Sequence, residues 1–138
     1  MKVLVVRVGR VGDMVMITPA LDALFDKHPD ARVTLLTGPE GRRVLAGFDP
    51  RIEDVWVYRR RGLVRLLARR TLRRSIEGAA FDAVFLFETN PGYLPLVQRA
   101  GSQVFALAPE PPAPPRHYAL RCLDLVSPGA SPRPVRLP

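Results

Sequence analysis

The sequence predicts an α/β fold in which an open parallel β-sheet carries helices on both faces. Residues 2–8 (KVLVVRV) are rich in valine and almost continuously apolar, which is typical of a strand buried on both sides. Along the rest of the chain, short apolar runs alternate five times with segments whose apolar residues recur at helical spacing. This alternation favours parallel strands joined by right-handed crossovers, as in the Rossmann-like class.

The predicted elements follow from these patterns in chain order. The expected strands are rich in valine, leucine or aromatic residues and lie at 2–8, 32–37, 53–58, 81–87 and 103–107. The expected helices lie at 13–28, 38–47, 62–77, 90–101 and 117–126. Within the first helix, Pro19 predicts a kink, or a restart of the helix with Thr18 as its cap. Since the working site of such sheets lies at the carboxyl ends of the strands, the loops expected to matter are 9–13, 37–41, 58–62, 87–93 and 108–117.

Length and proline content set the expected domain organisation. The chain has 138 residues, enough for one domain with a sizeable core. The proline-rich stretch 127–138 (SPGASPRPVRLP) is typical of a linker, so we expect a domain over 1–126 and the start of an interdomain linker over 127–138. No apolar run reaches the roughly 18 residues of a membrane-spanning helix, and the first residues lack a signal peptide pattern, which predicts a cytoplasmic location.

The net charge of +8 comes almost entirely from arginine and should attract anions. Phosphorylated lipids or sugars, an anionic membrane and nucleic acid are candidates, but no nucleic-acid recognition motif appears and aromatic residues are few. The single cysteine, Cys122, excludes an internal disulfide and is expected on a buried helix face. The two histidines are far apart and give no metal-binding pattern, so no metal is expected.

The stretch 58–75 (YRRRGLVRLLARRTLRRS) contains eight arginines around a helical stripe of leucines. One interpretation is a solvated outer helix. The other is contact with an anionic partner. Arg60 and its two neighbours follow a strand and would suit a phosphorylated acceptor, because arginine binds phosphate in a bidentate manner. The later arginines would suit peripheral contact with the anionic inner membrane.

The turn after the first strand contains Gly9 and Gly12 and leads into Asp13. A dinucleotide site needs a third glycine, a Walker A loop needs a lysine followed by serine or threonine, and neither pattern is present. A carboxylate at a helix start would also repel a phosphate. Asp13 is therefore either an N-cap, for which aspartate is preferred, or a catalytic carboxylate that accepts a proton from an attacking hydroxyl.

The segment MKVLVVRVGRVGDMVMITPALDAL resembles the opening of glycosyltransferase family 9, the ADP-heptose:lipopolysaccharide heptosyltransferases. Members open with a strand, a short loop, Gly-Asp and an apolar stretch that runs into Thr-x-Pro-Ala-Leu, which here are Gly12, Asp13 and Thr18–Leu21. HPDARVTLLTGP, EDVWVY, FDAVFLF, RAGSQVFAL and RHYALRCLDLV follow in the order of the family, so the resemblance covers nearly the whole chain. Two segments depart from the family pattern: VGRV before the Gly-Asp pair, and LFETNPGY after the fourth strand.

The resemblance implies a GT-B architecture, in which two Rossmann-like domains face each other across a cleft. The N-terminal domain binds the sugar acceptor, here implied to be lipopolysaccharide-core-like, and the C-terminal domain binds the donor, implied to be ADP-heptose. The implied reaction is an inverting transfer without metal or other cofactor, and the general base of the family falls on Asp13. This chain matches only the N-terminal half, so by itself it is expected to be inactive.

The residues expected to bind the acceptor follow strands or open helices at the predicted cleft, and they are Arg10, Gly12, Thr18, Arg60, Glu88, Asn90 and His117. Tyr118, beside His117, is a further candidate for the cleft. The alternative to a transferase domain is a non-catalytic Rossmann-like module that binds an anionic ligand or partner. A dehydrogenase-type nucleotide domain is the third hypothesis, which the missing glycine and Asp13 disfavour.

Overall fold

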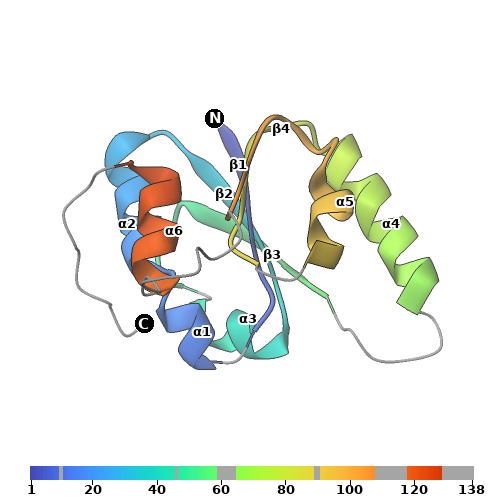
Figure 1. Ribbon diagram of the computed structural model, residues 1–138, viewed down its shortest axis with the longest axis horizontal. Helices are drawn as coiled ribbons and strands as arrows, with labels where there is room; N and C mark the ends of the chain where they lie inside the picture. Colours follow the sequence, from blue (N-terminus) through green and yellow to red (C-terminus); the bar gives the residue numbers. More distant parts are fainter. Residues whose placement is uncertain (10, 46, 59–64, 89–90, 108–117, 129–138) are drawn as a thin grey trace, which may run out of the picture.

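A computed structural model describes residues 1–9, 11–45, 47–58, 65–88, 91–107 and 118–128, and all structural statements concern these residues. Five strands form one sheet in the spatial order β3-β2-β1-β4-β5, and every neighbouring pair is parallel (Figure 1). The strands are β1 (Lys2–Arg7), β2 (Arg32–Thr37), β3 (Ile52–Val57), β4 (Phe81–Leu86) and β5 (Gly101–Ala106). The predicted α/β fold with a Rossmann-like parallel sheet is confirmed.

Helices cover both faces of this sheet (Figure 1). One layer contains α1 (Val11–Val15), α2 (Thr18–Lys27), α3 (Pro39–Leu45) and α6 (Tyr118–Val126). The other layer contains α4 (Arg65–Gly78), the short 3₁₀ turn η1 (Pro91–Tyr93) and α5 (Leu94–Val97). Helices α2 and α6 lie side by side although they are far apart in the sequence.

The continuous apolar run of β1 is explained by its central place in the sheet. Successive strand residues point to opposite faces, so Val3 and Val5 join the core beneath α2 and α6, whereas Leu4 and Val6 join the core beneath α4 and α5. All four side chains are fully buried. A strand covered on both faces has no position where a polar side chain would meet water, and β1 admits a charge only at its two ends.

The order in which the chain adds strands to the sheet reverses once. From β1 it moves outward through β2 to β3, and helix α4 then returns it to β4 on the other side of β1. The connections that leave the carboxyl ends of β1 and β4 therefore run to opposite faces of the sheet. This topological switch point is where ligands bind in open α/β sheets.

The first predicted helix, 13–28, is interrupted as Pro19 suggested, but Thr18 does not cap the second part. Helix α2 begins at Thr18, and the residue before it, Ile17, keeps a helical backbone (φ −89°, ψ −4°) without a side-chain cap. A capping side chain needs an extended backbone at that position, which is absent here. The Thr18 hydroxyl instead donates a hydrogen bond to the carbonyl of Val15, 2.8 Å away.

The other elements lie within a few residues of their predicted bounds. The largest difference is the predicted helix 90–101, where the structure has η1 and the four-residue helix α5 before β5 begins at Gly101. Pro91 and Pro95 lack the N–H that a helix interior uses, which limits the helix to its short form.

Helix α3 packs closely on the end of β2 because Gly41 has no side chain. A Cβ atom at Gly41 would overlap the Thr37 side chain and lie 3.0 Å from the terminal methyl carbon of Met14. The Thr37 hydroxyl donates to the Met14 sulfur at 3.5 Å, so these two side chains already occupy the space over Gly41. This contact fixes α3 against α1 at the carboxyl edge of the sheet.

We predict that Gly41→Ala lowers the free energy of unfolding by about 1–3 kcal/mol, because the added methyl group must displace Thr37. Gly12→Ala is the matched control, since Gly12 is also a helical glycine but a Cβ atom there would have nothing within 4 Å. In that open position alanine should stabilise by about 0.5–1 kcal/mol. Urea unfolding of both variants checks this, and equal shifts in the two variants would contradict the packing account.

Candidate active site

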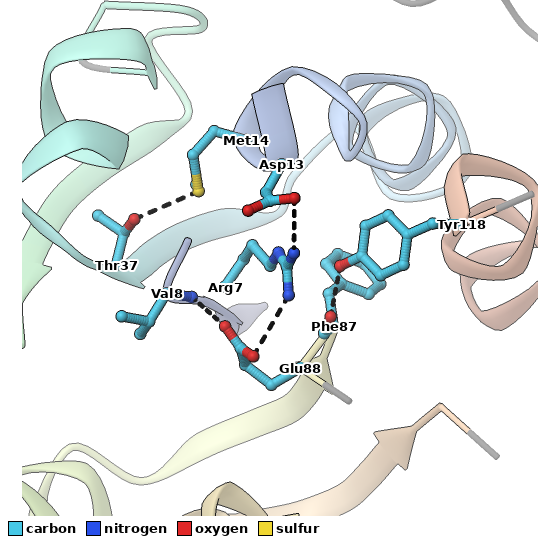
Figure 2. Close-up of polar contacts among 8 residues, drawn as sticks. All are labelled: Arg7, Val8, Asp13, Met14, Thr37, Phe87, Glu88 and Tyr118. Atoms are coloured by element: carbon cyan, nitrogen blue, oxygen red, sulfur yellow. Dashed lines mark hydrogen bonds and ion pairs between the residues drawn. The ribbon is translucent and has the colours of Figure 1, made fainter. Parts of the chain in front are cut away.

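The candidate site lies at the switch point, where a positive charge ends β1 and a carboxylate follows β4. Arg7 is the last residue of β1, Glu88 comes two residues after the end of β4, and Asp13 stands in the first turn of α1. Figure 2 shows the Arg7 guanidinium between the two carboxylates, with Tyr118 of α6 beside it. Residues from four elements or their ends thus meet at one edge of the sheet.

Arg7 forms an ion pair with each carboxylate through a different terminal nitrogen. Its Nη2 lies 3.2 Å from Oδ1 of Asp13, and its Nη1 lies 3.3 Å from Oε2 of Glu88. The side chains of Arg7 and Glu88 are 11% and 4% exposed, whereas that of Asp13 is 46% exposed. The Arg7–Glu88 pair is therefore internal, and Asp13 presents its carboxylate to the outside.

Glu88 joins the ends of two neighbouring strands. One carboxylate oxygen accepts the backbone N–H of Val8, just past β1, while the other accepts from Arg7 (Figure 2). A buried carboxylate is costly unless it is paired and hydrogen-bonded, and both conditions are met here. Glu88 was predicted to bind substrate; the structure places it at the site but buries it beneath Arg7.

Tyr118 covers the third side of Arg7. The centroid of its ring lies 4.7 Å from the guanidinium carbon, within the range of a cation–π contact. Its hydroxyl donates a hydrogen bond to the backbone carbonyl of Phe87. Burial raises the pKa of the Tyr118 hydroxyl, so this group keeps its proton and remains a donor. Helix α6 is in this way connected to both Arg7 and the end of β4.

Asp13 folds back over the turn that precedes α1. A Cβ atom on Gly9 would lie 2.8 Å from Oδ2 and 2.9 Å from Cβ of Asp13, so a residue with a side chain would displace the carboxylate. Helix α1 begins at Val11, and Asp13 therefore lies within its first turn and is not the N-cap. The capping interpretation of Asp13 is wrong, and its carboxylate faces Arg7.

The remaining predicted binding residues fall into three groups. Gly12 is exposed, and the space where a side chain would stand is open. Thr18 is fully buried and its hydroxyl is bonded within the chain, which places it in the core and away from any binding surface. Outside the described residues lie Arg10, Arg60, Asn90 and His117.

Arg7 is the residue whose importance the sequence indicated least. Arg10, which lies inside the glycine turn, was expected at the site, whereas Arg7 was not. A signal was present, because Arg7 interrupts an apolar strand buried on both faces and Glu88 follows another such strand. Opposite charges at the same edge of adjacent parallel strands predict a pair once the strand order is known.

Neither a metal site nor a membrane span is found in the part of the chain that the structure describes. No cluster of three or more histidine, cysteine, aspartate or glutamate side chains there could hold a metal ion. None of the helices formed by these residues has the length and apolar character needed to cross a bilayer.

Comparison with known proteins identifies solved structures that share this fold. No protein-family model matches the chain, and a search of curated proteins finds no similar sequence. Among solved structures, E. coli ADP-heptose lps heptosyltransferase II aligns with 100% of this chain and 46% of its own, with a TM-score of 0.75 and 18% identity. Glycosyl transferase family 9 from Veillonella parvula DSM 2008 aligns with 94% of this chain and 41% of its own (TM-score 0.73, 18% identity). E. coli heptosyltransferase WaaC with ADP-2-deoxy-2-fluoro heptose aligns with 92% of this chain and 47% of its own (TM-score 0.71, 16% identity).

These likenesses agree with the resemblance carried by the Gly-Asp segment. At 16–18% identity they show a shared fold, that of the heptosyltransferase structures. The chain spans less than half the length of each of these proteins.

The predicted burial of Cys122 is confirmed, and it has a measurable consequence. Cys122 lies on the inner face of α6, fully buried, and burial raises the pKa of its thiol to about 12. At about pH 8 the folded protein therefore holds almost no thiolate, which is the form that reacts.

We predict that Ellman's reagent modifies Cys122 only after unfolding in denaturant. Gln98→Cys, at an exposed position, should react rapidly in the folded protein, and equally rapid reaction of the unaltered chain would contradict the burial of Cys122.

Proposed function

We propose that this chain is the acceptor-binding domain of an inverting, metal-independent glycosyltransferase, with Asp13 as the general base. The observation that carries the proposal is an accessible carboxylate held at the switch point of a fold shared with heptosyltransferase structures. A half-exposed carboxylate that is ion-paired on one side can meet a hydroxyl on the other. Such a group suits general base catalysis of hydroxyl attack.

In the proposed reaction, the acceptor hydroxyl lies within hydrogen-bonding reach of the Asp13 carboxylate. Its oxygen forms a bond to the anomeric carbon of the donor sugar while its proton passes to Asp13. The bond between that carbon and the nucleoside diphosphate oxygen breaks, and the leaving diphosphate takes the electron pair. A single displacement of this kind inverts the anomeric centre.

The donor site is proposed to lie in a second domain. Each matched structure is more than twice as long as its aligned part, and this chain covers only that part. Heptose from ADP-heptose is the proposed sugar, since one matched structure is of a heptosyltransferase with ADP-2-deoxy-2-fluoro heptose and another is of an ADP-heptose lps heptosyltransferase. A lipopolysaccharide-core-like acceptor and a cytoplasmic location follow from the same proposal.

The alternative, a non-catalytic module for an anionic ligand, fits the net charge but not the site. At the switch point two carboxylates face one guanidinium, which leaves the described cluster with a net negative charge. A phosphate placed there would meet repulsion from Asp13. The geometry favours a neutral hydroxyl over an anion as the group that meets Asp13.

The exposed face of α4 supports a proposed contact with an anionic membrane. Arg70, Arg73 and Arg74 are exposed, while Arg69 donates a hydrogen bond to the Gly92 carbonyl. Between residues 69 and 78 the only acidic side chain is Glu77. Three exposed arginines against one glutamate leave this part of α4 with a net positive charge, which is suited to anionic lipid headgroups.

We predict that Asp13→Asn in the full-length protein lowers the rate of sugar transfer by about 10²–10⁴-fold, because the amide cannot accept the proton. Release of ADP from ADP-heptose with a lipopolysaccharide-core acceptor measures the rate. Asp30→Asn, which changes an exposed carboxylate 4.0 Å from the amino terminus, is the control and should leave the rate unchanged.

The 138-residue chain alone should give no turnover, because the proposed donor domain is absent. A near-normal rate for Asp13→Asn would show that Asp13 is not the general base. A full-length protein that transfers no sugar to any acceptor would favour the anionic-ligand module.

We also predict that the full-length protein binds vesicles that contain phosphatidylglycerol and not vesicles of phosphatidylcholine alone. Exchange of Arg70, Arg73 and Arg74 for glutamate should weaken binding by about 100-fold or more, since each basic residue near the surface contributes about 1 kcal/mol. The same exchange at the exposed Arg32, Arg42 and Arg43 is the charge-matched control. Sedimentation assays that show equal losses for both triple variants would reject a specific role for α4.

A further inference from the structure

The geometry points to Arg7 as the positioning residue of Asp13, with Glu88 and Tyr118 holding Arg7 in place. The inference rests on the proposed function, in which Asp13 is the base. It assigns to three residues outside the recognised Gly-Asp motif the task of fixing the orientation of the carboxylate inside that motif.

Helix α1 contributes little packing to the Asp13 side chain. This helix is only five residues long, and of its residues Met14 alone is buried. The residue over which the Asp13 side chain folds, Gly9, offers no side chain of its own. Since the Asp13 side chain is 46% exposed on so short a helix, a contact from a more rigid element has a large effect on its orientation.

Arg7 supplies such a contact. It ends the central strand β1, and its side chain is only 11% exposed. Its guanidinium engages Oδ1 of Asp13 with one terminal nitrogen and Glu88 with the other, as Figure 2 shows. Arginine can do this because its donors spread in a fixed plane, whereas the single ammonium of a lysine cannot reach both carboxylates in the same way.

The Arg7 guanidinium is in turn fixed by its neighbours. Glu88, held by the Val8 N–H, fixes one end, and the Tyr118 ring lies against it at 4.7 Å. Because the Tyr118 hydroxyl donates to the Phe87 carbonyl, the ring itself is anchored to the end of β4. Elements β1, β4 and α6 therefore converge on Arg7, and in the contacts drawn in Figure 2 it is Arg7 that connects them to Asp13.

One atom of Arg7 has no hydrogen-bond partner among the described residues. It is Nε, whose N–H is buried. A buried donor without a partner costs about 1–3 kcal/mol and in native proteins calls for an explanation. In the same orientation both terminal nitrogens of Arg7 face carboxylates, those of Asp13 and Glu88.

The test is a double-mutant cycle in the full-length protein. Arg7→Met should lower kcat by about 10–100-fold, the cost of a misplaced catalytic group, while the KM for the acceptor changes less than about threefold. Arg7→Lys should recover part of the loss, because it keeps the charge but holds Asp13 less firmly. In an Asp13→Asn background, Arg7→Met should change kcat by less than about threefold, because a residue that acts through Asp13 has nothing left to position.

Each other result overturns the inference. Multiplicative losses in the double variant would mean that Arg7 acts independently of Asp13, and a rise in KM with unchanged kcat would make it an acceptor-binding residue.

If Arg7→Met does not fold, as judged by thermal unfolding, Tyr118→Phe takes its place in the cycle. It keeps the ring but loses the hydroxyl, and it should lower kcat only when Asp13 is present. Loss of activity in Asp13→Asn with full activity in both Arg7 variants would reject the positioning role alone, whereas a full-length protein without transfer activity would reject the proposed function as well.

Discussion

The charge of Arg7 at the carboxyl end of the central strand sets conditions that the rest of the structure must meet. A guanidinium that is nearly buried needs a carboxylate within reach, and the nearest buried one must come from a neighbouring strand. Glu88 can serve only because the crossover through α4 places β4 directly beside β1. The cation also needs a cover on its open side, which Tyr118 provides only because α6 returns to the layer of α2. The ion-pair cluster around Arg7 therefore depends on the strand order, on the crossover through α4 and on the position of α6.

Much of the fold could be predicted from the sequence because its signals are local. The valine-rich run of β1 and the alternation of apolar strands with amphipathic helices depend only on neighbouring residues, and they predicted the sheet and its helix layers. Failures arose where tertiary packing decides. A restart of the helix with Thr18 as its cap was one of two expectations at Pro19, but the turn at Ile17 stays helical and the threonine is buried. No local pattern distinguishes these outcomes.

The candidate site was predictable in part for the same reason. Asp13 could be singled out because the Gly-Asp motif is a local pattern. The Arg7–Glu88 pair joins residues 81 positions apart, and it becomes visible only when the order of the strands is known. Polar residues after strands could be placed at the right edge of the sheet from sequence. Whether such a residue meets a ligand or supports another side chain depends on its depth, and Glu88 lies beneath the surface.

The net charge of the whole chain and the local charge at the switch point have opposite signs. The net charge of +8 attracts anions to the molecule as a whole, and exposed arginines of α4 contribute to that field. At the switch point the balance is reversed, since Asp13 and Glu88 outnumber the single guanidinium between them. If the proposed acceptor carries phosphates, these would draw it to the protein but would be oriented away from Asp13. The group left to face the carboxylate is a neutral hydroxyl, which is the group that a general base must meet.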